Sequence, residues 1–583
     1  MNRIIAVLLV LISFTGLSQS NVHFTNPVAT NVLAGNYNPG DYSSSAGQDP
    51  HAIALDIEGR ISADSLKSYL VRMALFETRN TGSDTVSNTR GIGAARRWAF
   101  SKFQNISAQN NNRLVVSYLH WEKNLCGMLE HKNVVAILPG LELGTTNSSA
   151  PGIVVVEAHL DSRCSDGCDT ACVAEGMEDN GSGSALVLDL ARVMAKYQFN
   201  RTILFMLTSA EEQGLVGAQA LADYCAAQQI DIAAVLNNDV IGGVICGETS
   251  SPPSCPSEND VDSTRVRLFS AGSAFSRNKQ LSRYVKLQYE DELREQVSVP
   301  MMVTIMSAED RTGRGGDHIP FRQKGFASVR FTSANEHGDG NPSQAGYHDR
   351  QHTSEDILGE DTNNDNIIDK WYVDFNYLAR NAAINGAAAA MIGQNVCEPE
   401  VLLVTQTDWK TLEVTIAGDF CSWPTSVIGV RTESNDWDTL IYTDQQVTSF
   451  DIEPGHNYFI SAASINTSGI ESLFTQEQVV QVVGIDEAAI SNQGIVLFQN
   501  KPNPFDETTS IAFMVYDMPA PKTALIRIND VNGKLVSEVA VDIKMGLNEI
   551  IYDHGYGQLG TFIYSLVIDG KVLDSKRMVF VAN

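Results

Sequence analysis

The stretch that decides the fold is Gly152-Ile-Val-Val-Val-Glu-Ala-His159-Leu-Asp161. A mostly apolar run over residues 153–158 ends at a His and an Asp. Such a run predicts a buried strand of the kind found in a parallel sheet covered by helices. Ligand sites of open α/β sheets lie at the carboxyl ends of the strands, so the polar residues after the run are candidates for a site.

Strand-like and helix-like segments alternate around this stretch. We expect a helix over 184–197, a strand over 202–208, a helix over 215–227 and a strand over 233–237. This alternation predicts an α/β domain over residues 61–397, with a mostly parallel central sheet flanked by helices.

The composition is that of a globular protein. The chain has 583 residues, of which 43% are hydrophobic and 19% charged, and its formal net charge is −28. Phosphate binding needs clustered Lys and Arg, which the sequence lacks, so we expect no nucleic-acid partner.

The N-terminus has the order of a secretory signal peptide. A short positive start, an apolar run over 4–12 and a small, polar segment over 16–20 predict a signal peptide at residues 1–20. A membrane anchor is the alternative, which the short run disfavours, and no other stretch approaches the roughly 18 apolar residues of a span. We therefore expect an exported mature chain without a transmembrane span.

Nine cysteines in an exported chain predict disulfides with one cysteine left over. Cys246 with Cys255 and Cys397 with Cys421 are candidate local pairs. The run from Cys164 to Cys172 has three-residue gaps, which differ from the two-residue gap of zinc knuckles, so it favours disulfide or loop chemistry over metal binding.

Polar side chains follow three predicted strands and open one predicted helix. Because the strand ends meet at one edge of the sheet, we expect these side chains to converge. They are His159, Asp161, Asp179, Glu211, Glu212 and Asp239. Several buried carboxylates around one His need cations, and imidazole with carboxylates suits zinc, with cobalt or manganese as alternatives.

The sequence spacing of these residues suggests a separate role for each of them. His159 and Asp161 are two residues apart on a strand, so the Asp161 carboxylate can brace the imidazole. The adjacent Glu211 and Glu212 cannot point the same way, so one is expected to bind metal while the other acts as general base.

These motifs occur together in a known family. His159-x-Asp161, Asp179-Asn-x-Ser-Gly183, Glu211-Glu212-x-Gly214-x-x-Gly217 and Asp239 resemble those of the co-catalytic di-zinc exopeptidases of the bacterial leucyl aminopeptidase, aminopeptidase Y and carboxypeptidase Q type. The resemblance covers about residues 62–395. It implies a secreted zinc-dependent exopeptidase acting on peptides or proteins, with an aminopeptidase favoured over a carboxypeptidase or dipeptidase.

The resemblance also implies a role for each residue. His159 and Asp239 would bind one zinc, Glu212 the other, and Asp179 both, while Glu211 would be the general base. The remaining ligand would be His352, which precedes Thr353-Ser-Glu-Asp356, with His348 as the competing choice. The segment from Asp317 to Phe321 would form a wall or support.

An acidic stretch beyond the site has partial calcium-loop spacing. Asp361, Asn363, Asp365 and Asp369 resemble the first half of such a loop, but Asn366 and Tyr372 replace the Gly and Glu that complete it. A solvated acidic loop is an equal alternative.

The remainder of the chain predicts other modules. Residues 21–60 are weakly patterned and predict a leader or extended arm, whereas the pattern from residue 399 onward predicts two small all-β sandwich domains.

Residues 399–483 resemble a fibronectin type III module with Tyr458 as its corner tyrosine. Residues 490–583 contain Leu497-Phe-Gln-Asn-Lys-Pro502-Asn-Pro504-Phe505, Asp530-Val-Asn-Gly533-Lys534 and Gly560-Thr-Phe-Ile-Tyr564. In this order they resemble the C-terminal sorting domain of type IX secretion substrates. That resemblance implies the type IX machinery as a partner and a secreted or outer-membrane location in a bacterium.

Two other functions remain as alternatives. A glutaminyl-cyclase-like acyltransferase would use one zinc and would not use the first-strand His as a ligand. A non-catalytic adhesin would bind no zinc. The number of zinc ions per chain therefore separates both from the di-zinc peptidase.

Overall fold

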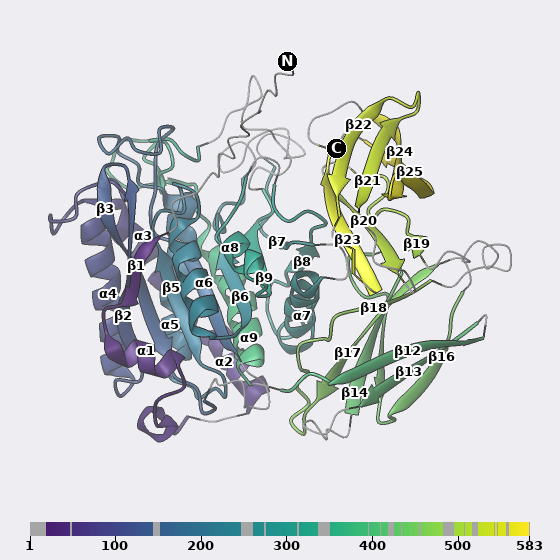
Figure 1. Ribbon diagram of the computed structural model, residues 1–583. Helices are drawn as coiled ribbons and strands as arrows, with labels where there is room; N and C mark the ends of the chain where they lie inside the picture. Colours follow the sequence, from purple (N-terminus) through teal and green to yellow (C-terminus); the bar gives the residue numbers. More distant parts are fainter. Residues whose placement is uncertain are drawn as a thin grey trace, which may run out of the picture.

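The computed structural model describes residues 19–581 except for 47–48, 144–151, 246–259, 273–275, 312–313, 336–349, 395, 409, 418–424, 433, 454–455, 482–494, 506–507, 516–522, 542, 545 and 555–558. Of the predicted signal peptide, only the last two residues lie within this part. The described chain consists of an α/β domain followed by two pairs of β-sheets (Figure 1).

A nine-stranded sheet organises the α/β domain, in the order β1-β2-β3-β5-β4-β6-β9-β7-β8. Its strands are β1 (Ser20–Phe24), β2 (Val115–Leu125), β3 (Met128–Leu138), β4 (Ile153–His159), β5 (Ile203–Thr208), β6 (Ile232–Asn238), β7 (Arg265–Phe269), β8 (Met302–Ile305) and β9 (Ser328–Ser333). The central strands β5, β4, β6 and β9 are parallel, as are β7 and β8. The pairs β1–β2, β2–β3, β3–β5 and β7–β9 are antiparallel. The predicted α/β fold with a parallel sheet centre is confirmed.

Helices cover both faces of this sheet. They are α1 (Pro27–Leu33), α2 (Pro50–Arg60), α3 (Ala63–Ala74), α4 (Gly91–Gln109), α5 (Gly183–Met194), α6 (Val216–Gln228), α7 (Arg277–Glu292), α8 (His318–Gln323) and α9 (Phe375–Gly393), with short turns η1 (Pro39–Tyr42) and η2 (Met177–Ser182). One buried cluster packs helices α2, α3, α4, α5, α7 and α9 against one face of the sheet. A second cluster packs α1, α6 and α8 against the other face. None of the described helices combines the length and apolarity that a bilayer span requires.

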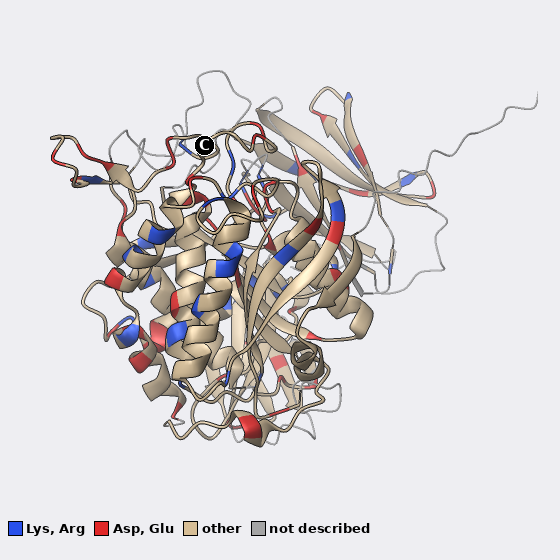
Figure 2. Cartoon of the chain, turned by 90° about the vertical axis from the view of Figure 1, so that its left-hand side faces the viewer, with Lys and Arg blue, Asp and Glu red and all other residues tan. Residues whose placement is uncertain are grey.

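Charged residues of both signs lie interspersed on the outer side of the α/β domain. Figure 2 shows this side, on which basic and acidic residues alternate along the helices. Such mixing keeps a chain of net charge −28 from presenting one uniform field on this side.

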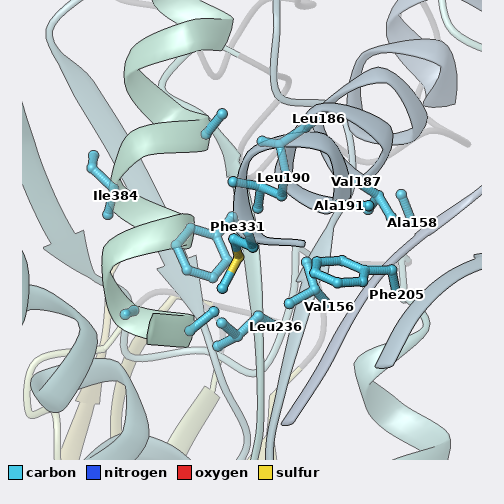
Figure 3. Packing of buried hydrophobic residues seen from close by; sticks show 14 of the residues in the cluster. Val156, Ala158, Leu186, Val187, Leu190, Ala191, Phe205, Leu236, Phe331 and Ile384 are labelled. Carbon is cyan, nitrogen blue, oxygen red and sulfur yellow. The ribbon is translucent and has the colours of Figure 1, made fainter. Parts of the chain in front are cut away.

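The core around strand β4 is closely packed. Val156 and Ala158 of β4 meet Leu186 and Leu190 of α5, with Phe205 of β5 beside them (Figure 3). Helix α5 begins at Gly183, where a Cβ atom would lie 2.2 Å from the carbonyl oxygen of Asn238. Only glycine permits this approach, which brings the start of α5 against the end of β6.

Residues 21–60 are not the predicted leader or extended arm. They supply the edge strand β1 together with α1 and α2. Ala29, Val32, Ile53 and Ile57 are at most 2% exposed. The apolar residues are spaced so that short elements bury them against the sheet, so this segment is part of the α/β domain.

Two β units follow the α/β domain. The first unit consists of a three-stranded and a four-stranded sheet. The three-stranded sheet contains β12 (Val401–Asp408), β13 (Thr411–Ala417) and β16 (Val447–Asp451). The four-stranded sheet contains β15 (Thr439–Thr443), β14 (Thr425–Arg431), β17 (Asn457–Ile465) and β18 (Gln478–Gln481). The second has the sheets β19 (Ile495–Leu497), β20 (Thr508–Val515) and β23 (Gly546–Asp553), and β22 (Leu535–Ala540), β21 (Ala524–Asp530), β24 (Gly560–Ile568) and β25 (Lys571–Phe580). The small two-stranded sheet β10 (Gly359–Glu360) and β11 (Lys370–Trp371) precedes them. The extra β-sheets are as predicted.

The first β unit docks on α7. Arg283 of α7 and Arg431 of β14 both pair with Glu477, and all three side chains are fully buried. The hydrophobic core of the α/β domain also continues into this unit through Val427, Ala463, Ile465, Ile470 and Phe474.

Disulfides join loops near the carboxyl ends of the strands. Cys126 pairs with Cys168 and Cys164 with Cys172, so the run from Cys164 to Cys172 forms disulfides, as expected. Cys225 is buried and free. Cys397 is also disulfide-bonded. Cys246, Cys255 and Cys421, named in the predicted local pairs, lie outside the described residues.

Candidate metal centre

The predicted site residues meet at the carboxyl edge of the parallel strands. His159 is the last residue of β4, Glu211 and Glu212 follow β5, and Asp239 follows β6. Asp179 lies in η2, just before α5, and His352 comes from a distant loop.

Asp179 stands between the two histidines. Its Oδ1 lies 3.0 Å from His159 Nε2, and its Oδ2 lies 3.1 Å from His352 Nε2. Asp239 Oδ1 completes the first set at 3.4 Å from His159 Nε2, and Glu212 Oε2 completes the second at 3.1 Å from His352 Nε2.

Candidate ligand atoms lie within 4.8 Å of one another in three groups among the described residues. Two of them share Asp179: His159, Asp179 and Asp239 form one, and Asp179, Glu212 and His352 form the other. The third consists of His159, Glu211 and Glu212. Glu212 Oε1 is buried and has no hydrogen-bond partner among the described residues. One nitrogen and two carboxylates per group suit zinc, so these residues fit two zinc ions.

The electrostatics keep the shared carboxylate ionised. Burial alone would raise the pKa of Asp179, but hydrogen bonds from His159 and His352 hold it well below its usual range. Burial opposes a charged His352, yet Glu212 and Asp179 raise its pKa to about 9. The cluster thus attracts positive charge strongly, whether from protons or from metal ions.

Glu211 differs from its neighbour Glu212. Burial, followed by repulsion from Glu212 and Asp239, raises the pKa of Glu211 well above its usual range, although His159 opposes the shift. Glu211 also lines the cavity above the ligands. A carboxyl group with an elevated pKa at the cavity wall suits a group that accepts and returns a proton.

Asp161 supports the centre in a different way from that predicted. Its backbone carbonyl oxygen, not its carboxylate, contacts His159 Nδ1 at 3.0 Å, whereas the nearest carboxylate oxygen is 3.8 Å away. The carboxylate accepts hydrogen bonds from the backbone N–H groups of Glu211 and Glu212, both at 3.3 Å. The difference arises because the chain leaves the strand after His159, which ends the same-face relation that the prediction assumed.

His352 is the histidine that the structure places at the centre, while His348 lies outside the described residues. Two arginines stand behind the His352 ring. Arg163 Nη2 lies 2.7 Å and Arg314 Nη1 3.2 Å from His352 Nδ1. Arg163 also donates to Glu212 Oε2 at 2.7 Å, so it contacts two of the proposed ligands.

Further supporting residues escaped the sequence analysis. Asp356 accepts hydrogen bonds from the backbone N–H groups of Glu178 at 2.8 Å and Asp179 at 2.9 Å. Arg330 of β9 pairs with Asp239 at 3.2 Å and with Asp310 at 2.6 Å. A charged residue inside the buried run of β9 was the available signal, because such a charge needs a buried partner.

Glu157 is another charged residue within a buried strand that the sequence did not single out as part of the site. It is fully buried within β4, and neither carboxylate oxygen has a hydrogen-bond partner among the described residues. Burial, followed by repulsion from Asp317, raises the pKa of Glu157 well above its usual range.

The segment from Asp317 to Phe321 supports the sheet side of the centre. Thr208 Oγ1 donates to Asp317 Oδ2 at 2.5 Å, and burial raises the pKa of Asp317 to about 7. Neither metal group includes Asp317 or His318.

The predicted calcium residues lie on an exposed loop. Asp361 accepts hydrogen bonds from the backbone N–H groups of Asp365 and Asn366, and Asp369 accepts one from Thr362. The loop thus satisfies its own carboxylates, and calcium binding there stays a prediction.

A cavity of about 290 Å³ opens over the ligands. The ligands, Glu211 and three arginines, Arg163, Arg311 and Arg314, are among the residues that line it. Its floor is therefore acidic and part of its wall is basic.

Residues 133–369 match the profile described as Peptidase family M28. The α/β domain is M28 peptidase-like. The matched residues include every proposed ligand together with Glu211. In open α/β sheets ligand sites lie at the carboxyl ends of the strands, which is where the candidate metal groups lie here.

Similar proteins are zinc metalloproteases by description. A probable zinc metalloprotease of Pyrenophora tritici-repentis is 31% identical over 293 residues, which are 48% of this chain and 65% of that protein. Another from Pyricularia oryzae is 29% identical over 368 residues, 61% of this chain and 68% of that protein. The chain thus spans about two thirds of the length of these relatives. The Legionella pneumophila LapA aminopeptidase structure is 20% identical, covers 60% of this chain and 78% of its own, and has a TM-score of 0.42.

The comparison corrects the predicted location. The matching metalloproteases belong to fungi, including Pyrenophora, Phaeosphaeria and Pyricularia. They contradict the predicted location at the outer-membrane surface of a bacterium, which rested on the signal peptide and on residues 490–583.

Proposed function

We propose that the chain is a zinc-dependent exopeptidase, and that it acts as an aminopeptidase. The observation that carries this proposal is the pair of ligand groups that share Asp179, with Glu211 beside them on the cavity wall. His159 and Asp239 would hold one zinc ion, Glu212 and His352 the other, and Asp179 both.

The ions, when bound, supply a Lewis acid and make water a better nucleophile. Glu211 removes the proton from the attacking water, because its carboxylate faces the cavity and is not a member of the shared Asp179 groups. The elevated pKa of Glu211 then favours holding that proton until the leaving amine takes it. Asp161 fixes the backbone of Glu211 and so its direction.

A second candidate is an exopeptidase that recognises a substrate carboxylate, such as a dipeptidase. Arg163, Arg311 and Arg314 line the same cavity as the metal ligands. A guanidinium group binds a carboxylate in a planar, two-point geometry, so a free C-terminus or an acidic side chain near the scissile bond fits this wall.

A peptide panel tests both candidates. The purified protein is incubated with one short peptide in four forms, with the N-terminus, the C-terminus, both or neither blocked, with and without a chelator. An aminopeptidase cleaves every form with a free N-terminus, whereas a dipeptidase needs both ends free. Cleavage of the doubly blocked peptide, or activity that the chelator does not reduce, contradicts the proposal.

Metal content distinguishes the other classes. Two zinc ions per chain agree with the proposal, one would favour the cyclase-like acyltransferase, and none the adhesin. Retention of first-strand His159 in the ligand set favours the peptidase.

We also propose that residues 399–483 form a fibronectin type III-like domain. The Tyr458 hydroxyl accepts a hydrogen bond from the backbone N–H of Glu453 at 2.8 Å, which supports the corner-tyrosine role.

A further inference from the structure

A second cavity lies apart from the metal centre, between α4 and the β2–β3 hairpin. Its volume is about 580 Å³, and none of the metal ligands lines it. Arg96 and Arg97 of α4 form one side, and Tyr118 of β2 and Lys132 of β3 lie on the hairpin side.

Arg96 is the unusual residue in this cavity. Its side chain is only 7% exposed, yet it makes no hydrogen bond or ion pair with any residue that the structure describes. Burial lowers the pKa of Arg96 to about 10, so the guanidinium stays charged at neutral pH. A buried, unpaired charge is costly, and folded proteins ordinarily supply it with a partner.

Other buried arginines of this chain show what Arg96 lacks. Arg79 donates to the carbonyl oxygens of Leu160 and Gly176 at 2.7 and 2.8 Å. Arg113 donates to the carbonyl oxygens of Tyr42 and Tyr197 at 2.6 and 2.8 Å. Arg96, in contrast, lines an accessible cavity in which an external acceptor can meet it.

The rest of the cavity is positively charged as well. Arg97 donates to the backbone carbonyl of Thr85 at 2.7 Å, and Lys132 Nζ lies 5.5 Å from the centre of the Tyr118 ring. Glu130 is the only acidic residue among those that line the cavity, and it is exposed. Three cations against one anion are notable in a chain of net charge −28.

The walls of the cavity are fixed. Tyr118 stacks on Phe100 of α4 at a centroid distance of 4.5 Å. The disulfide from Cys126 ties the turn of the hairpin to Cys168. A preformed, rigid site loses little entropy when a ligand enters.

We propose that this cavity binds a small oxyanion, with the Arg96 guanidinium as its principal donor and Lys132 and Arg97 as supporting cations. The guanidinium fork matches two oxygens of a phosphate, sulfate or carboxylate group. The bound anion would supply the acceptor that the protein does not provide to Arg96. This site is independent of the peptidase chemistry.

Thermal unfolding of the metal-loaded protein tests the proposal. Phosphate, sulfate and succinate are titrated in a chloride buffer of constant ionic strength. We expect a saturable rise in Tm with at least one of them, and the three responses identify the preferred anion. Anion bound at the metal centre is recognised because its contribution persists in Arg96→Met.

Variants assign the response to the cavity. Arg96→Met removes the Arg96-dependent rise, and because it deletes an unpaired buried charge, its Tm in anion-free buffer is not below that of the wild type. Lys132→Gln, a change at a half-buried side chain, weakens anion binding several-fold. Arg60→Met, at an exposed residue of α2, serves as the control and keeps the full response.

Two results overturn the proposal. One is an identical anion response in the wild type, Arg96→Met and Lys132→Gln. The other is a large loss of Tm in anion-free buffer for Arg96→Met without loss of an anion response, which makes Arg96 a structural cation only.

Discussion

At the scale of single residues, two carboxylates position the candidate metal centre by accepting hydrogen bonds from backbone N–H groups. Asp356 accepts the N–H groups of Glu178 and Asp179, and Asp161 accepts those of Glu211 and Glu212. The proposed ligands Asp179 and Glu212 and the proposed base Glu211 are therefore oriented by their own main chain. This leaves their carboxylate oxygens available for metal and water.

Replacement of Glu211 by Gln tests its role as base. The amide keeps the size of the side chain but cannot accept the proton from water, so we expect kcat to fall by several orders of magnitude while zinc content is unchanged. Steady-state kinetics and metal analysis of the same preparation measure both. Glu58→Gln on α2 is the control, and near-normal turnover of Glu211→Gln would exclude the assignment.

The fifth ligand is tested by a pair of histidine variants. We expect His352→Ala to lower the zinc content from two ions to one per chain, because His352 faces Asp179 and Glu212 at 3.1 Å. His348→Ala should retain both ions. Metal analysis after dialysis checks this, and the opposite pattern would transfer the ligand role to His348.

At the scale of elements, the sequence predicted what short-range patterns determine. The ends of β4, β5 and β6 fall where apolar runs meet polar residues, and α5 and α6 lie within a few residues of the predicted helices. The packing of residues 21–60 against the sheet was not predictable, because β1 pairs with residues 95 to 102 positions further along the chain. The support of Asp239 by Arg330 escaped prediction for the same reason, since β6 and β9 become neighbours only in the sheet.

Helix α7 carries a lysine whose burial predicts a pH dependence of stability. Burial and the neighbouring Arg283 lower the pKa of Lys279 to about 7, whereas an unfolded lysine titrates near about 10.4. Between these values the unfolded chain binds a proton that the folded chain does not. The free energy of unfolding therefore rises with pH, by at most about 1.4 kcal/mol per unit from this group.

Lys279→Met removes this contribution. We expect the variant to gain less stability than the wild type between pH 7 and 9 in urea unfolding. Lys534→Met, at an exposed lysine of the second β unit, should keep the wild-type slope. Equal slopes for Lys279→Met and the wild type would show that Lys279 does not titrate in this range.

At the scale of the whole molecule, the first β unit and the α/β domain share one core. Val427 and Phe474 belong to the same buried cluster as α7, and His51 of α2 contacts the carbonyl oxygen of Ser468 at 2.8 Å. Tyr284 of α7 also donates to the carbonyl oxygen of Glu471 at 3.1 Å. We infer that the two parts unfold together, although the metal ligands all lie in the α/β domain.

Glu477 is the residue on which this shared interface can be tested. Its carboxylate pairs with Arg283 at 3.2 Å and with Arg431 at 2.7 Å, and all three side chains are fully buried. Glu477→Gln removes the carboxylate with which both buried cations pair, which is expected to cost about 3–5 kcal/mol of stability. Calorimetry should show one transition at a lower Tm, and hydrogen exchange should show faster exchange along α7.

Zinc content should not change, because no ligand touches Glu477. Glu453→Gln, at an exposed position of the same unit, is the matched control. Two separate transitions in the wild type would instead show that the β unit is only tethered to the peptidase-like domain.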